Sequence, residues 1–370
     1  MVGALVALSA CKNGDAGDEA AAGQGGAAGT ASGGAGGGGA TGGSASENAG
    51  AGAAGGAGTA GSSGTGGAGA GGGAGSTGGT GDTGGTGAAG SDASVHADAE
   101  IPGGTGPFPP VSDFAAAGPY TSTTVSNVGP NNNYTLYIPA ELAPGGAKNP
   151  IVGWMSGGAT DHTWYTLLPH LATHGFFVVA SNTVPSIGAE AALGEEIIAG
   201  IEWAIAENAR AGGEYEGKLD TTKIASVGYS MGSLATFTIA MDERLTTTVH
   251  ISGGNMVPER VNNLRKPAAF ICGIPGDAAC TLLDSHCDIA ATNCNTDFEG
   301  ASTPVFYATF QSGHLGIMTS PYMERISGMT TEWLRYHLMS DPTRQGSFIG
   351  DGCTYCEDTA SWTVKQKNLE

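Results

Sequence analysis

Lys223-Ile224-Ala225-Ser226-Val227-Gly228-Tyr229-Ser230-Met231-Gly232 is the stretch that decides the fold. Its first half is apolar and predicts a buried strand, and Leu234 to Met241 after it predicts a helix. A G-x-S-x-G pentapeptide between a strand and a helix is typical of a nucleophile elbow, a tight turn that exposes a reactive serine. Glycines are needed there because side chains on either flank of the serine would collide. The stretch predicts Ser230 as a nucleophile, with the N–H of Met231 directed at the reaction centre.

Strands alternate with helices on both sides of this stretch. Upstream, the apolar pattern predicts strands at 151–156 and 176–181 and helices at 165–174 and 189–210. Downstream it predicts strands at 247–252, 268–274 and 305–310 and a last helix at 323–338. An antiparallel hairpin of residues 120–127 and 133–139 precedes them. The pattern predicts an α/β fold in which a mostly parallel central sheet is flanked by helices.

The N-terminal third differs sharply in composition from the rest. Residues 11–90 hold 35 of the 66 glycines, interleaved with Ala, Ser and Thr. Such a segment cannot bury enough apolar surface to offset its chain entropy. We therefore expect a disordered linker over 12–100 and one catalytic domain over 101–370.

The first residues resemble an export signal. Val2 to Ala10 is apolar, and Leu8-Ser9-Ala10-Cys11 resembles a bacterial lipobox. We expect 1–11 to be a lipoprotein-type signal segment with Cys11 as the lipidated residue. The apolar stretch is too short to span a bilayer, so membrane contact is expected only through the lipid. The protein is expected to be exported, either held at the outer membrane or cell surface or secreted.

The charge balance is strongly acidic. The net charge is −20, and no run of lysine or arginine stands out. Nucleic acid and anionic membrane surfaces are therefore poor partners on electrostatic grounds. We expect a monomer that needs no cofactor.

Six cysteines remain once Cys11 is set aside. An even set in an exported protein predicts disulfides but does not fix their pairing. Cys353-Thr-Tyr-Cys356 predicts a staple in the C-terminal tail, paired internally or with another cysteine. A zinc site is an alternative with irregular spacing, and we expect no metal. Its ligands would be Cys280, His286, Cys287 and Cys294.

A serine nucleophile needs a base, and the base needs an acid to orient it. Behind an elbow of this kind, acid and histidine follow in that order at the ends of later strands. Asp277 follows the strand 268–274, and His314 follows the strand 305–310. The sequence therefore predicts Ser230, Asp277 and His314 as the catalytic residues. Their rivals are Asp284 and Asp288 for the acid, and His162, His250 and His286 for the base.

The oxyanion of an acyl-transfer reaction needs two preorganised donors. Met231 N–H is the first. Gly157-Gly158-Ala159 follows the strand 151–156 and predicts Gly158 N–H as the second, with Ala159 N–H as the alternative. Tyr229 and Met231 flank the nucleophile and are expected to line the substrate pocket. Residues of the same loop, His162, Trp164 and Tyr165, are further candidates for shaping its opening.

Several segments together resemble the bacterial cutinases and poly(ethylene terephthalate) hydrolases, in the dienelactone-hydrolase-like group of α/β-hydrolases. The segments are Leu171 to Val179, Leu219 to Gly232, Lys266-Pro267, Ser312-Gly313-His314, and Asp341 to Arg344 before Ser347-Phe348. The resemblance implies an α/β-hydrolase fold and ester hydrolysis by Ser230, Asp277 and His314. It also implies Met231 as oxyanion donor and pocket wall. Tyr229 stands where these relatives usually have Trp or His.

The sequence as a whole predicts a carboxylesterase that acts on short- to medium-chain esters, with polyesters among its candidate substrates. Its partner would be an ester, either a small molecule or a polymer. Two other hypotheses stay open. The same residues would serve a peptidase or a chlorophyllase-like hydrolase. The second hypothesis is a non-catalytic lipoprotein of the cell envelope that keeps the fold.

Overall fold

A computed structural model describes residues 108–186, 190–253, 258–274 and 287–370. The predicted signal segment, Cys11 and the linker lie outside the described residues, so the domain boundaries stay predictions. Nine strands form one sheet in the order β1-β2-β4-β3-β5-β6-β7-β8-β9. The strands are β1 Ser122–Val128, β2 Tyr134–Pro139, β3 Asn149–Met155, β4 Phe177–Ser181, β5 Leu219–Tyr229, β6 Leu245–Ile251, β7 Ala268–Gly273, β8 Val305–Phe310 and β9 Thr363–Lys367.

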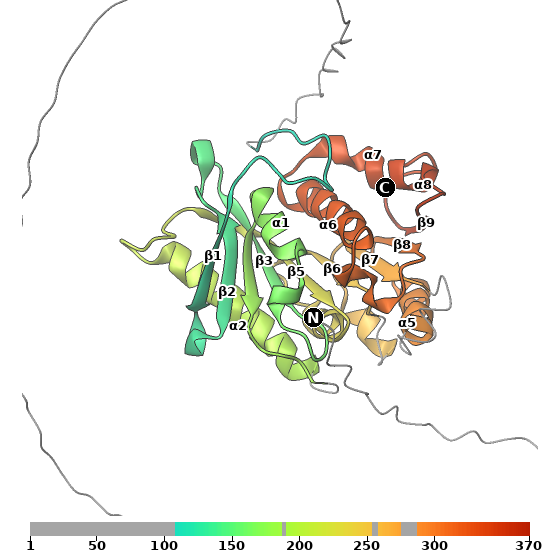
Figure 1. Cartoon of the computed structure of the whole chain (residues 1–370), viewed down its shortest axis with the longest axis horizontal. Helices are drawn as coiled ribbons and strands as arrows, with labels where there is room; N and C mark the ends of the chain where they lie inside the picture. Colours follow the sequence, from blue (N-terminus) through green and yellow to red (C-terminus); the bar gives the residue numbers. More distant parts are fainter. Residues whose placement is uncertain (1–107, 187–189, 254–257, 275–286) are drawn as a thin grey trace, which may run out of the picture. The chain divides into compact units, whose positions relative to one another are not determined.

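The centre of the sheet is parallel and its two borders are antiparallel. β4, β3, β5, β6, β7 and β8 pair in parallel. The hairpin β1–β2 joins β4 antiparallel on one side, and β9 joins β8 antiparallel on the other (Figure 1). This is the mostly parallel sheet with an N-terminal hairpin that the sequence predicted, and it confirms the α/β-hydrolase fold class.

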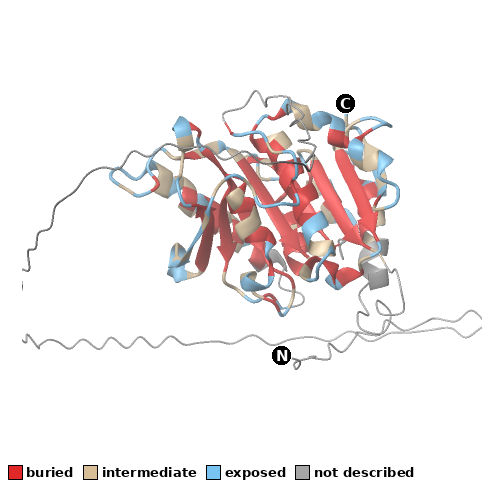
Figure 2. Cartoon of the chain, turned by 45° about the horizontal axis from the view of Figure 1, so that its top comes forward, coloured by how far each residue is buried: buried red, intermediate tan, exposed pale blue. Residues whose placement is uncertain are grey.

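Helices cover both faces of the sheet. They are α1 Leu167–Thr173, α2 Glu190–Ala209, α3 Met231–Ile239, α5 Cys287–Gly300, α6 Tyr322–Leu338, α7 Gln345–Phe348 and α8 Thr354–Glu357. On one face, Leu171 of α1 and Trp333 of α6 pack in one core cluster with Trp154 of β3. On the other, α2 and α3 share a second cluster, and Phe237 of α3 meets α5 in a third. The central strands are therefore buried from both sides (Figure 2), as parallel strands usually are.

Between β3 and β5, the direction in which the chain adds new strands across the sheet changes. β3 pairs with β4 on one side and with β5 on the other, so the connections after these strands diverge. In open parallel sheets, such a switch point leaves a crevice at the carboxyl ends of the strands, where ligands bind. Gly157 lies two residues after the end of β3, and Ser230 follows β5 directly. The fold thus brings two of the predicted site segments to one place.

The structure contains elements that the sequence did not predict. α5 has few apolar side chains, and a disulfide between Cys272 of β7 and Cys294 of α5 fixes it to the sheet. β9 is a polar, partly exposed edge strand, and its pairing with β8 defines it. Neither element carries a clear apolar period, so both depend on long-range contacts.

Two disulfides confirm the prediction of a disulfide-bonded protein. Cys353 pairs with Cys356, so the C-terminal staple is internal. Cys294 pairs with Cys272, which removes its thiolate from the alternative zinc site. Cys280 and His286 lie outside the described residues. Among the residues that the structure describes, no group of three or more His, Cys, Asp or Glu could hold a metal ion. Among the described helices, none has the length and apolar character to cross a membrane.

Candidate active site

Ser230 occupies a strained turn between β5 and α3. Its backbone has φ 52° and ψ −114°, a conformation that non-glycine residues rarely adopt. Two hydrogen bonds hold the turn: Ser230 N–H donates to the Ile251 carbonyl (2.9 Å), and Leu234 N–H donates to the Ser230 carbonyl (3.1 Å). The elbow is therefore tied both to the neighbouring strand β6 and to its own helix.

The two glycines of the pentapeptide are required by close backbone contacts. A Cβ at Gly228 would overlap the carbonyl oxygen of Gly232. A Cβ at Gly232 would overlap the carbonyl oxygen of Met155, at the end of β3. The strand, the turn and the helix can approach this closely only because neither position has a side chain.

His314 lies within hydrogen-bond distance of the serine. It begins the short helix η5 (His314–Met318), directly after β8. Its Nε2 is 3.0 Å from Ser230 Oγ, and the side chain is 8% exposed. The distance is suited to direct proton transfer from a hydroxyl to an imidazole. Two residues 84 positions apart in the sequence are thus brought together.

The rival histidines for the role of base lie elsewhere. His250 stacks on Phe237 with ring centroids 3.8 Å apart, and its Nε2 is 2.9 Å from Thr248 Oγ1. Burial lowers the pKa of His250 to about 3, so it is neutral at physiological pH. His162 Nδ1 is 2.7 Å from Tyr137 Oη, and burial lowers its pKa as well. His286 lies outside the described residues.

The loop after β3 approaches Met231. A Cβ at Gly158 would lie 3.3 Å from Met231 Cγ. Ala159 N–H donates to the Pro185 carbonyl (3.0 Å), whereas Gly157 N–H donates to Tyr165 Oη (3.0 Å). Since both neighbours already have acceptors, Gly158 N–H is the loop donor that best suits an oxyanion. Met231 is the first residue of α3, so its own N–H has no acceptor within the helix.

Tyr229 is buried beside Ser230, with 2% of its surface exposed. Its ring lies 5.2 Å from that of His314 and 5.6 Å from that of Tyr165, between centroids. Its hydroxyl donates to the His314 carbonyl oxygen at 2.9 Å. The sequence suggested Tyr229 only as a pocket wall, and nothing in the motif indicates this bond to a residue far along the chain.

The acid of the predicted triad follows β7. Asp277 and its rival Asp284 lie outside the described residues, as does the side chain of Asp288. The chain just before them is placed against the histidine loop: Gly313 N–H donates to the Ile274 carbonyl (3.1 Å), and Ile274 N–H donates to the Phe310 carbonyl (2.9 Å). The segment that carries Asp277 therefore begins next to the loop that carries His314.

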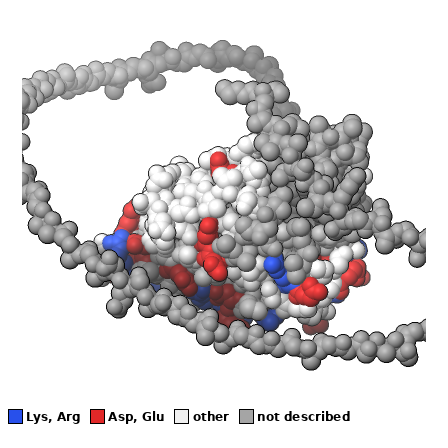
Figure 3. Space-filling model, turned by 90° about the horizontal axis from the view of Figure 1, so that it is seen from below, with Lys and Arg blue, Asp and Glu red and all other residues white. Residues whose placement is uncertain are grey.

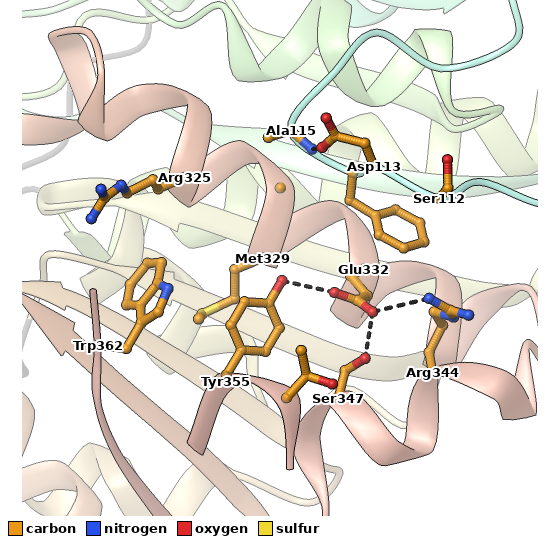
Figure 4. A pocket seen from close by; sticks show the side chains of 13 residues that line it. Ser112, Asp113, Ala115, Arg325, Met329, Glu332, Arg344, Ser347, Tyr355 and Trp362 are labelled. Atoms are coloured by element: carbon orange, nitrogen blue, oxygen red, sulfur yellow. Dashed lines mark hydrogen bonds and ion pairs between the residues drawn. The ribbon is translucent and has the colours of Figure 1, made fainter. Parts of the chain in front are cut away.

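A cavity of about 320 Å³ lies away from these residues, between residues 112–115, α6 and the segment from α7 to Trp362 (Figure 4). Glu332 inside it accepts hydrogen bonds from Ser347 Oγ (2.5 Å) and Tyr355 Oη (2.7 Å), and Arg344 lies 3.4 Å away. Burial, with Glu332 beside it, raises the pKa of Tyr355 well above its ordinary value. Ser347, Tyr355 and Arg344 thus all bond to Glu332, which suits a structural role.

One face of the molecule shows an uneven distribution of charged side chains. On the face shown in Figure 3, acidic residues gather toward one border, basic residues are few, and a broad part carries neither. Exposed apolar side chains include Trp164 (56% exposed), Val184 and Leu315. These three follow β3, β4 and β8, whose carboxyl ends lie at the edge of the sheet that carries Ser230.

Comparison with protein-family models places part of the chain in a known family. The family model described as PETase, PET hydrolase-like, matches residues 97–285, about half of the chain. The matched range includes the elbow, the Gly157–Ala159 loop and Asp277, and it ends before His314. No curated protein matches the chain.

Proposed function

Since the chain belongs to the PET hydrolase-like family, we propose that it is a serine carboxylesterase for short- to medium-chain esters, with polyesters among its candidate substrates. The observation that carries the proposal is the 3.0 Å separation of Ser230 Oγ and His314 Nε2 at a strained elbow. Hydroxyl and imidazole at this separation form the reactive pair of acyl-transfer enzymes.

In the proposed mechanism, Ser230 Oγ attacks the ester carbonyl while His314 Nε2 takes its proton. The carbonyl oxygen becomes an oxyanion, which accepts hydrogen bonds from Met231 N–H and Gly158 N–H. Collapse expels the alcohol, which receives the proton from His314, and leaves an acyl-serine. Water then attacks this ester, again with His314 as base, and releases the acid. Asp277 is proposed to orient the imidazole and stabilise its charged form.

Replacement of the nucleophile tests this function. Ser230→Ala should lower the turnover of a p-nitrophenyl ester by at least about 10⁴-fold, because the acyl-enzyme cannot form. Ser226→Ala is a matched control: Ser226 lies in β5, four residues before Ser230, is buried and bonds to Thr236 Oγ1 at 3.0 Å. The control should keep its activity and react with a fluorophosphonate probe, and the Ser230 variant should not react. Full turnover in Ser230→Ala would refute the proposal, and unreactive native protein would favour a non-catalytic lipoprotein.

The substrate range is addressed by esters of graded acyl length, assayed beside an amide analogue and a polyester film. We expect ester turnover to exceed amide turnover, since an alcohol leaves more readily than an amine. Equal rates on both would favour the peptidase alternative.

We also propose that the protein is exported and anchored through a lipid on Cys11. The disulfides Cys272–Cys294 and Cys353–Cys356 support export, since such bonds persist in oxidising compartments. Mass spectrometry of protein from cell envelopes should find Cys11 as a lipid-modified first residue. An unmodified Cys11 within an uncleaved chain would contradict the anchor.

A further inference from the structure

We propose that Tyr229 is a positioning residue, whose hydroxyl holds the backbone of His314 so that the imidazole stays aligned with Ser230. This inference rests on the proposed function, since it assigns a role around the same nucleophile and base. It gives Tyr229 a task other than lining the substrate pocket.

The first support is the contact between Tyr229 and His314. Tyr229 Oη donates to the carbonyl oxygen of His314 at 2.9 Å, and the two rings lie 5.2 Å apart at 32°. Tyr229 is also the residue directly before Ser230. Tyr229 ends β5 and Ser230 follows it in the turn, so the nucleophile and the anchor of the base are consecutive residues of the chain.

The second support is the packing that holds the Tyr229 ring in place. The Tyr165 ring lies 5.6 Å from the Tyr229 ring, and the Trp154 ring lies 4.9 Å from that of Tyr165, between centroids. The loop Gly157–Ala159 packs against the same ring: a Cβ at Gly157 would lie 2.6 Å from Tyr229 Cδ1. Gly157 N–H in turn bonds to Tyr165 Oη, and Thr160 Oγ1 lies 2.5 Å from the same oxygen. The Tyr229 ring thus contacts both the loop that carries Gly157 and the ring of His314.

The third support is the short backbone segment on which His314 stands. Gly313 before it has φ 67°, and η5 after it is a five-residue 3₁₀ helix. Such a segment has fewer internal restraints than a long helix. The hydrogen bond from Tyr229 to the His314 carbonyl restrains the backbone of His314 directly. Proton transfer depends steeply on alignment, so loss of this restraint should slow the chemical step.

The test compares two tyrosine-to-phenylalanine variants. Tyr229→Phe removes the bond to His314 and keeps the ring. Tyr134→Phe is the matched control, because Tyr134 is equally buried and its hydroxyl donates to the Glu196 carbonyl at 2.8 Å, on the α2 face of the sheet. Each variant loses one buried hydrogen bond from a tyrosine to a backbone carbonyl, so similar falls in Tm are expected.

We expect Tyr229→Phe to lower kcat about tenfold at nearly unchanged KM, whereas Tyr134→Phe keeps both constants, since only the former loses alignment of the base. Rates are expressed per active site titrated with the fluorophosphonate probe, so misfolded protein does not contribute. Equal kcat in the two variants would overturn the inference, and so would a rise in KM at constant kcat, which would indicate a pocket wall. Failure of the proposed function is distinct, because it would appear as full activity in Ser230→Ala.

Discussion

At the scale of single residues, the elbow depends on positions that have no side chain. Ser230 is held at positive φ, which costs about 1–3 kcal/mol in backbone strain. The surrounding contacts must compensate for this, and they can form only because Gly228 and Gly232 let three backbone segments meet. The reactive geometry is therefore set by the backbone before any catalytic side chain is considered.

Gly232→Ala tests this requirement. Its methyl group would overlap the Met155 carbonyl, so the free energy of unfolding should fall by roughly 3 kcal/mol or more and ester turnover should be lost. Gly346→Ala in α7 is the control, since nothing lies within 4 Å of its Cβ. That change should be neutral or slightly stabilising. Urea unfolding measures both, and equal stabilities of the two variants would contradict the argument.

At the scale of elements, the disulfide Cys272–Cys294 joins β7 to α5. These two elements bound residues 275–286, the stretch that carries Asp277. A cross-link between the flanking elements restricts the separation of the two ends of this stretch.

Removal of this bond should destabilise the domain more than removal of the C-terminal staple. Cys272 and Cys294 are 22 residues apart, and Cys353 and Cys356 are only 3 apart. For the longer loop, the chain-entropy model predicts about 3 kcal/mol of stabilisation, and the shorter loop should give less. Unfolding of the Cys272→Ala/Cys294→Ala variant beside Cys353→Ala/Cys356→Ala measures the difference. A larger loss in the second variant would refute the ranking.

At the scale of the whole molecule, buried histidines couple stability to pH. Burial lowers the pKa of His174 to about 4 and that of His250 to about 3. His174 Nε2 also lies 3.1 Å from the Ala116 carbonyl, where it holds the N-terminal segment of the domain. Unfolded histidine titrates near 6.5, so below that pH the unfolded chain binds more protons than the folded one.

The free energy of unfolding should therefore fall as pH decreases from about 6.5 toward 4, with each such histidine contributing about 1.4 kcal/mol per pH unit. His250→Asn removes one of these groups, so the pH slope should become shallower by that amount. Chemical unfolding at a series of pH values measures it. An identical slope in variant and native protein would show that His250 is not responsible.

The sequence by itself determined the local features of this protein. The pentapeptide specified the elbow, because its glycines act within five residues. The apolar periods specified the central strands and the main helices, because burial on one or two faces imposes these periods. The order of the site segments also followed from the sequence, since each comes directly after a strand.

Only the tertiary structure decided which side chains meet. The 3.0 Å contact of Ser230 with His314, rather than with His162 or His250, depends on where β8 lies in the sheet. The pairing of Cys272 with Cys294, the edge strand β9 and the Tyr229 bond to the His314 carbonyl depend on it as well. These contacts join residues that are far apart in the chain, so no local pattern encodes them and only the assembled sheet brings them into contact.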